Sequence, residues 1–577
     1  MTIENKVRLY RLNNVGVVVF LSLAFWLCCI VLGYVDWEQN DDVAMNLIAV
    51  GAYGYRTPYL VFVDYIFGAL IYVLYSIFPG VNCYLWTFLV LNFLSVIVIS
   101  YILSEKLSLI KTVAVTLALN CLMSYDFYLK LEFTKNAMLY SVVGAIILLW
   151  QIFFREKIKW GGTIIGGLFI FMGFCVRRQS FLMTVPFIVG SFFVFLFDAL
   201  KQKKISKEKM ASVAIAIAIP VLLCLVSLIV NWYCYKCNAS WDEYWKINGI
   251  LVEKRDYWQY YFVDAPEEYL DAGITELDME LLGNWTWNDP EMFSLNNLEK
   301  IAAVGERFRT DKIEFYKEII WEISGRIADV IRNNGIAFMF AVLVFLSVIT
   351  DNRTRVIVLC CLGTLLLGYF YIVCRGRYAW HAEICVWLPA VIFSAFAIMQ
   401  FFTSKYQCGN DSEMSIYSKV MTCVQIILII ALAFSWQFYQ FYTEKNYSLT
   451  VDDSAGYEMF QNIKDSDAFF VIHMKNAGRY WGAKNIFDVD CKYTGLYTNS
   501  TYLGAWLIPT PLAVEAYQKF GIENPIKDLI KDNVYCVADE DIIDLLHSYL
   551  EETYQYNLTE VQVEVDGVSA WKFSLLE

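Results

Sequence analysis

Long apolar runs recur along most of this chain, each of about 20 residues, the length that an α-helix needs to cross a bilayer. Hydrophobic residues make up 58% of the sequence and charged residues only 18%, which is typical of a multi-span membrane protein. We therefore predict an α-helical polytopic membrane protein with about 11 transmembrane helices. The predicted spans are residues 12–34, 84–103, 112–125, 136–154, 160–176, 180–197, 210–235, 333–350, 356–374, 384–402 and 420–442.

The composition becomes polar and mixed after residue 442. Residues 469–473 and 533–538 are short apolar runs typical of buried strands, and residues 541–549 have a helical pattern. Residues 561–565 and 570–575 are expected to pair as a closing hairpin. These features predict two domains, a transmembrane domain over residues 1–442 and an α/β domain over residues 443–577.

Charge is distributed unevenly along the chain. Lys6, Arg8 and Arg11 precede the first span, and the short loops between later spans are mostly basic, whereas the loop 236–332 and the C-terminal domain are acidic. The positive-inside rule then places the N-terminus in the cytoplasm and the C-terminal domain outside the plasma membrane. Within the outer loop 35–83, the apolar segment 57–83 is expected to lie as a juxtamembrane helix in the interface, because counting it as a span would turn the two richest basic loops outward.

Four carboxylates stand within the stretch 35–45, directly after the first span. They are Asp36, Glu38, Asp41 and Asp42. Asn40 is expected to cap a helix that ends at Gly51 and carries Asp41 and Asp42 in its first turn. Acids at this position often only complement the helix dipole, so the pair is open to a structural and to a catalytic interpretation.

Arginines are expected on the same face of the membrane. Arg177 and Arg178 follow one span, and Arg375 and Arg377 follow another. A guanidinium can bind two phosphate oxygens at once, so we predict that these side chains contact a lipid phosphate. The alternative is that they are ordinary interfacial arginines.

The outer loops hold two further features. The outer loops could hold a divalent metal ion as a cofactor, with Asp42, His381 and Glu383 as candidate ligands. These are weak candidates, because so few ligands do not define a site. The loop after residue 235 is rich in tryptophan, which suits either stacking on sugar rings or packing at the membrane interface. These tryptophans are Trp241, Trp245, Trp258, Trp285 and Trp287.

The order of these features resembles the GT-C superfamily of integral-membrane glycosyltransferases. The resemblance rests on a first span, the outer sequence Gln-Asn-Asp-Asp-Val-Ala-Met from Gln39, Gly51 near the helix end, and a juxtamembrane segment that ends in Phe-Pro-Gly. The segment Gly173-Phe-Cys-Val-Arg-Arg-Gln-Ser-Phe is similar to bacterial members of the protein O-mannosyltransferase and aminoarabinose transferase type. The Trp-Trp-Asp signature of oligosaccharyltransferases and the Lys-Pro-Pro of aminoarabinose transferases do not occur.

The resemblance implies a function. It implies an inverting transferase that moves a sugar from a polyprenyl-phosphate donor to a glycan, lipid or protein acceptor of the cell envelope, with Asp41 as catalytic carboxylate and Asp42 beside it. A polysaccharide polymerase or ligase is one alternative, and a lipid or polysaccharide transporter is another. The predicted spans hold essentially no ionisable residues, which disfavours transport. Membrane lipids are expected around the helices, and nucleic acid is not expected as a partner.

Overall fold

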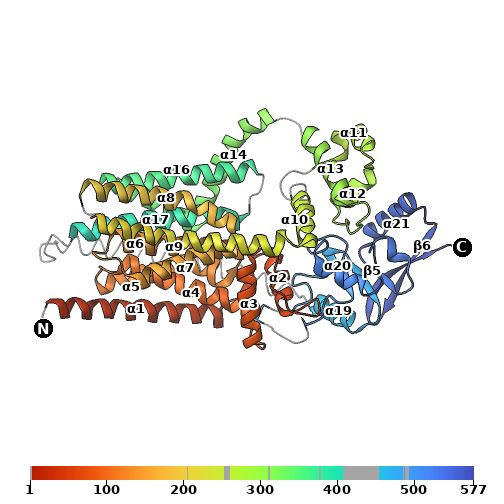
Figure 1. Cartoon of the computed structure of the whole chain (residues 1–577), viewed down its shortest axis with the longest axis horizontal. Coiled ribbons are helices and arrows are strands. Elements are labelled where there is room, and N and C mark those ends of the chain that lie inside the picture. Colours follow the sequence, from red (N-terminus) through yellow and green to blue (C-terminus); the bar gives the residue numbers. More distant parts are fainter. Residues whose placement is uncertain are drawn as a thin grey trace.

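The computed structural model describes residues 3–203, 206–252, 260–308, 312–375, 379–406, 454–484, 486–487 and 493–576. In Figure 1 the long helices lie side by side in one bundle, and the C-terminal domain lies beyond one end of it. Eight helices in the described part of the chain are long and apolar enough to cross a membrane. They are Asn14–Leu32 within α1 (Ile3–Leu32), α4 (Cys83–Ser104), α5 with its π-helical turn (Leu109–Leu129), α6 (Phe133–Phe153), α8 (Arg178–Lys201), α9 with the turn after it (Glu208–Lys236), α16 (Asn352–Cys374) and Trp380–Thr403 within α17 (Trp380–Tyr406).

The other three predicted spans differ from expectation. The helix α7 (Trp160–Val176) has only 17 residues. The predicted span 333–350 is part of a bent pair, Trp321–Asn333 and Gly335–Ser347, with 100° between the two helices. The bend follows from Asn334, whose side chain accepts hydrogen bonds from the backbone N–H groups of the next helix and so starts a new helix there. The last predicted span, 420–442, lies outside the described residues. The described part of the chain therefore holds eight candidate spans, or nine if the bent pair is counted as a single span.

The helices α6 and α17 form the centre of the bundle, since 94% and 83% of their apolar windows are buried, against 11% for α1. The helix α7 packs closely on α6. A Cβ atom at Gly173 would lie 2.6 Å from the Ala137 carbonyl oxygen, and one at Gly144 would lie 2.5 Å from the Gly166 carbonyl oxygen. Glycine at these positions allows α7 and α6 to pack in direct backbone contact. This close packing positions Arg177, which directly follows α7.

The short helix α3 (Tyr65–Ile77) lies across the end of the bundle (Figure 1). Its 13 residues are too few to span a membrane. Asp64 caps it by accepting a hydrogen bond from the Ile66 N–H. This arrangement agrees with the predicted juxtamembrane helix.

Beyond the bundle the chain forms short helices and one sheet. The sheet has the strand order β4-β3-β5-β7-β6, with β3 parallel to β4 and β5 and the last two strands antiparallel. The structure confirms the strands predicted near residues 470 and 535, the helix after them and the closing hairpin. The strand β4 was not predicted, because three residues are too few to show an alternation of apolar and polar side chains. The elements beyond the bundle are α10 (Ala239–Val252), α11 (Pro266–Asp271), α12 (Glu276–Gly283), α13 (Leu295–Phe308), α19 (Ser454–Asp465), β3 (Phe469–Ile472), β4 (Ser500–Tyr502), α20 (Pro511–Gln518), β5 (Val534–Val537), α21 (Glu540–Tyr554), β6 (Leu558–Val565) and β7 (Val568–Leu575). The bent pair belongs to α14 (Lys312–Asn333) and α15 (Gly335–Ser347), and α15 packs against α17 in the bundle.

The two ends of the bundle differ in their chemistry. Basic loops contact one another at the end far from the C-terminal domain. There Arg155 pairs with Glu105 at 2.7 Å, and the Lys209 ammonium donates to the Arg155 carbonyl oxygen at 3.0 Å. The opposite end carries α2 (Asn40–Val50), α3 and the C-terminal domain (Figure 1).

The charge difference predicts the orientation in a membrane. Lys203 in the turn after α8 and Glu552 in α21 are both exposed, so a cysteine at either site would be reachable from its own side. We expect a membrane-impermeant maleimide to label Glu552→Cys in intact cells and to label Lys203→Cys only after permeabilisation, because basic loops stay in the cytoplasm. Peptide mass spectrometry locates the label despite the native cysteines. Labelling of Lys203→Cys alone in intact cells would reverse the orientation.

Candidate active site

The helix α2 holds the acidic pair at one end of the bundle. Gln39 is its N-cap residue and Asn40 its first helical residue, so the predicted cap was wrong by one position, and no side chain caps this end. Asp41 and Asp42 lie in the first turn, as predicted. The helix ends at Gly51, whose φ of 109° is left-handed backbone that favours glycine.

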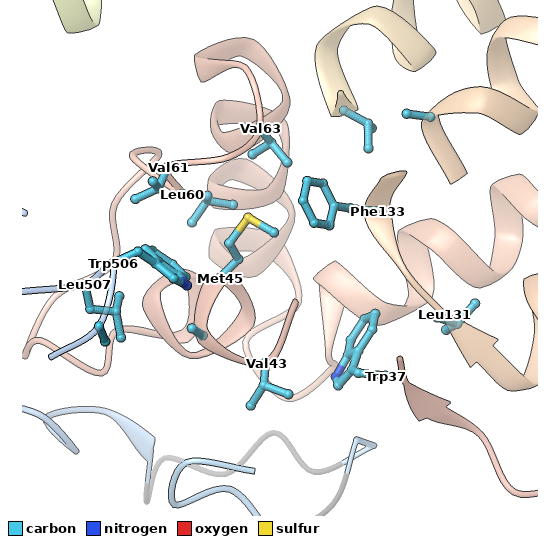
Figure 2. Close-up of a cluster of buried hydrophobic side chains, with 14 of the residues drawn as sticks. Trp37, Val43, Met45, Leu60, Val61, Val63, Leu131, Phe133, Trp506 and Leu507 are labelled. Carbon is cyan, nitrogen blue, oxygen red and sulfur yellow. The ribbon is translucent and has the colours of Figure 1, made fainter. Parts of the chain in front are cut away.

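The stretch before α2 is held by a short parallel ladder. The strand β1 (Asp36–Trp37) pairs with β2 (Lys130–Leu131), which connects α5 to α6. The apolar side of α2 is covered from two directions (Figure 2). Met45 points between Phe133 at the start of α6 and Trp506 of the C-terminal domain. The acidic pair is therefore fixed by the bundle on one side and by the C-terminal domain on the other.

Asp42 is fully buried below the acidic turn. It accepts a hydrogen bond from the Tyr84 hydroxyl at 2.9 Å and one from the Phe133 N–H at 3.3 Å. Burial raises the pKa of Asp42 well above its usual value, the nearby charge of Glu132 raises it further, and the two hydrogen bonds oppose this rise. Asp42 is thus placed to anchor the turn rather than to exchange protons with a substrate.

Asp41 is only half-buried, and one of its oxygens accepts a hydrogen bond from the Trp506 indole N–H at 2.9 Å. The Trp506 ring in turn contacts Phe62, with 4.5 Å between ring centroids. The indole orients the Asp41 carboxylate at the mouth of a pocket. This contact could not be predicted from local sequence pattern, because 465 residues separate the two positions.

This pocket, which we call the arginine pocket, has a volume of about 140 Å³. It is lined by first-turn residues of four helices, α2, α6, α8 and α17, and by the last turn of α16. A helix N-terminus carries partial positive charge, and two of these four, α2 and α8, have no side-chain cap, so they favour a bound anion. The lining residues are Gln39, Asp41, Glu132, Phe133, Thr134, Arg177, Gln179, Ser180, Met183, Tyr371, Ile372, Arg375, His381 and Ala382.

The predicted arginines separate into two groups. Arg177 and Arg375 both line the arginine pocket, and the Arg177 guanidinium also lies over the Phe133 ring, 4.8 Å from its centroid. Arg178 does not line it, because its guanidinium binds the Asp64 carboxylate at 2.7 Å. Its predicted role in phosphate binding therefore finds no support in the geometry. Arg377 lies outside the described residues.

Glu132 is the second acid of the arginine pocket, and it was not singled out in the sequence. Its carboxylate caps α6 by accepting the Lys135 N–H at 2.8 Å. Burial raises the pKa of Glu132, while the charge of His381 opposes this rise and the charge of Glu38 adds to it.

A buried network of charges lies beside the pocket. The Lys135 ammonium binds Glu38 at 2.5 Å and Asp126 at 3.1 Å, and the His381 ring lies 3.6 Å from Glu38. Although burial opposes ionisation, the charges of Lys135 and His381 lower the pKa of Glu38 to about 2. Asp126 and Lys135 lie just outside the predicted spans 112–125 and 136–154, but the observed helices Leu109–Leu129 and Phe133–Phe153 are longer at this end and include them.

The candidate metal ligands do not form a common site. Asp42 is bound to Tyr84, and Glu383 forms a two-pronged ion pair with Arg326 at 2.6 and 2.9 Å. His381 faces Glu38 instead of Glu383. Among the residues that the structure describes, no group of three His, Cys, Asp or Glu side chains is placed to hold a metal ion.

The burial of Asp42 predicts a pH dependence of stability. The pKa of Asp42 is raised in the folded state, so the folded protein is destabilised when Asp42 must ionise. The contribution of Asp42 to the free energy of unfolding is therefore fully present below the unfolded pKa of about 3.9, and it is lost as the pH rises through the folded pKa. Asp42→Asn keeps an acceptor for Tyr84 but cannot titrate. We expect the Tm of the variant, relative to the unmodified protein, to increase between pH 4 and pH 8 in detergent. A Tm difference that stays constant with pH would show that Asp42 ionises as freely in the folded protein as in the unfolded chain.

No protein-family model matches this sequence, and no curated protein sequence matches it either. The function of the site is therefore inferred from its geometry.

Proposed function

We propose that this protein is a membrane glycosyltransferase that moves a sugar from a polyprenyl-phosphate donor to a cell-envelope acceptor on the outer face of the membrane. The observation that carries the proposal is the arginine pocket, which Asp41, Arg177 and Arg375 line together although they come from distant parts of the chain. A carboxylate and two guanidiniums are the groups that such a transfer requires.

The arginine pocket suits a phosphate monoester. Arg177 and Arg375 supply forked donors for phosphate oxygens, and the helix N-termini add N–H groups and positive potential. Met183 and Ile372 line the same pocket and belong to the membrane-spanning helices α8 and α16. A lipid phosphate could therefore occupy the pocket while its hydrocarbon chain lies among apolar side chains.

In the proposed reaction Asp41 is the general base. It takes the proton of the acceptor hydroxyl as the acceptor oxygen bonds to the anomeric carbon of the sugar. The bond between that carbon and the phosphate oxygen breaks, and the polyprenyl phosphate leaves with the electron pair. Attack from the face opposite the leaving group inverts the anomeric centre. The two arginines stabilise the charge on the leaving phosphate.

The buried charges within the spans bear on the transporter alternative. The Lys135 ammonium pairs with both Glu38 and Asp126, and the three residues cluster beside the arginine pocket instead of being spread along the bundle. A transport pathway would need ionisable or polar groups along its length. The network is better explained as the support of a surface-facing site.

The proposal predicts the effect of removing the base. Asp41→Asn keeps the size of the side chain and an acceptor for Trp506, so Tm should stay within a few degrees of the parent. Loss of a general base should lower turnover by at least about 100-fold. The measurement is sugar transfer from a defined polyprenyl-phosphate sugar by purified protein. Near-normal turnover would contradict the catalytic role of Asp41, and the acidic pair would then only complement the dipole of α2.

Arg177 and Arg178 form a matched pair for a second test. Arg177→Gln should raise the KM for the lipid donor by about tenfold or more, because a charge-assisted bond to phosphate contributes about 1.5 to 3 kcal/mol. Arg178→Gln should instead lower stability, because the buried Asp64 loses its partner, and should leave the donor KM unchanged per folded molecule. The same donor KM for both variants would contradict the assignment of Arg177 to the phosphate.

A further inference from the structure

The segment between α2 and α3 contains a strained backbone position. Val61 is buried and has a φ of 72°, a left-handed value that a β-branched residue rarely adopts. The Phe62 N–H donates to the Leu60 carbonyl oxygen at 3.1 Å, so Val61 is the central residue of a γ-turn. We call residues 60–62 the Val61 turn. Strained backbone persists only where the surrounding structure imposes it, and it often lies at functional sites.

Two contacts hold the chain on either side of the Val61 turn. The helix α3 packs directly on the chain before the turn, since a Cβ atom at Gly68 would overlap the Pro58 carbonyl oxygen. The chain after the turn is tied to the end of α7, because the Asp64 N–H donates to the Cys175 carbonyl oxygen at 2.7 Å. Cys175 lies two residues before Arg177, so the turn and this arginine are held in one frame.

The Val61 turn places the half-buried Phe62 ring beside Arg177. The guanidinium lies 5.6 Å from the centroid of Phe62 and 4.8 Å from that of Phe133, and the planes of the two rings differ by only 16°. The face of an aromatic ring attracts a cation within about 6 Å of its centroid. Such a contact orients a guanidinium without using the N–H groups that bind phosphate oxygens.

Phe62 also contacts the C-terminal domain. Its ring centroid lies 4.5 Å from that of Trp506, whose indole N–H donates to Asp41. Leu60 and Val61 belong to the same apolar cluster as Trp506 (Figure 2). One tryptophan therefore contacts Asp41 directly and reaches Arg177 through a single ring.

We propose that Phe62 is a positioning residue for Arg177, and that the C-terminal domain holds Phe62 in place through Trp506. The inference rests on the proposed function for the identity of the ligand, a polyprenyl phosphate. Docking of the domain then orients two groups of the arginine pocket, Asp41 by a hydrogen bond and Arg177 by a ring contact.

The test measures the binding of a polyprenyl phosphate, which carries no sugar, to the purified full-length protein by native mass spectrometry. Phe62→Leu should weaken binding by about three- to tenfold, because the guanidinium loses one of its two rings. Phe62→Tyr keeps the ring and should bind like the parent. Phe153→Leu is the matched control. It removes a half-buried ring that packs on Phe192 and Phe195 at the last residue of α6, at the opposite end of the bundle, so binding should persist.

Two combinations of variants test whether the effect passes through Arg177 and Trp506. In an Arg177→Gln background Phe62→Leu should weaken binding no further, because no guanidinium remains for the ring to hold. Trp506→Leu should weaken binding as Phe62→Leu does. Trp506→Phe keeps a ring against Phe62 and should bind the polyprenyl phosphate like the parent.

The outcomes separate this inference from the proposed function. Weaker binding by Phe62→Leu that depends on Arg177 supports the positioning role even if no sugar transfer is detected, and the glycosyltransferase proposal then fails alone. Equal binding by Phe62→Leu and Phe153→Leu, the same loss in the Arg177→Gln background, or no binding of polyprenyl phosphate by the parent would overturn the inference. If transfer is established, Phe62→Leu should raise the KM for the donor and leave kcat nearly unchanged.

Discussion

One buried carboxylate, that of Asp36, joins the three parts of the molecule that meet at the site. Lys130 binds it at 3.1 Å from the turn before α6, and Tyr480 donates to it at 2.9 Å from the C-terminal domain, where Arg479 also contacts it. Asp36 is fully buried, and an unpaired charge in such a place costs several kcal/mol. The folded state therefore requires both cations, and this requirement fixes the C-terminal domain against the first outer loop.

The position of the C-terminal domain matters because it orients Asp41 in the arginine pocket. Trp506 reaches Asp41 only when the domain is docked, and the backbone of Gly495 and Tyr497 also bonds to the end of α2. The domain is held from a second side by Asp289, a buried carboxylate that accepts bonds from Asn524, Tyr549 and Tyr554. Both junctions are polar and buried, so they orient the domain more strictly than apolar packing alone would.

The sequence predicted well what depends on local pattern. Apolar runs located the spans, the Gly51 stop and the acidic first turn were placed correctly, and Arg177 and Arg375 share one pocket with Asp41. It could not predict which neighbour in Arg177-Arg178 faces that pocket. Arg177 lies in extended backbone between α7 and α8, and Arg178 is the first residue of α8. Arg178 is held away from the pocket by Asp64, which is 114 residues away in the sequence. Trp506, Glu132 and the Lys135 network were missed for the same reason, because a contact between distant residues leaves no local signature.

The central claim is that a lipid phosphate binds between Arg177 and Arg375, beside Asp41. Cryo-electron microscopy of the protein with a polyprenyl phosphate would test it most directly. The account predicts phosphate density within hydrogen-bond distance of both guanidiniums, at the end of the bundle that carries the C-terminal domain. Phosphate density at the opposite end, beside Arg155 and Lys209, with the arginine pocket empty, would contradict it.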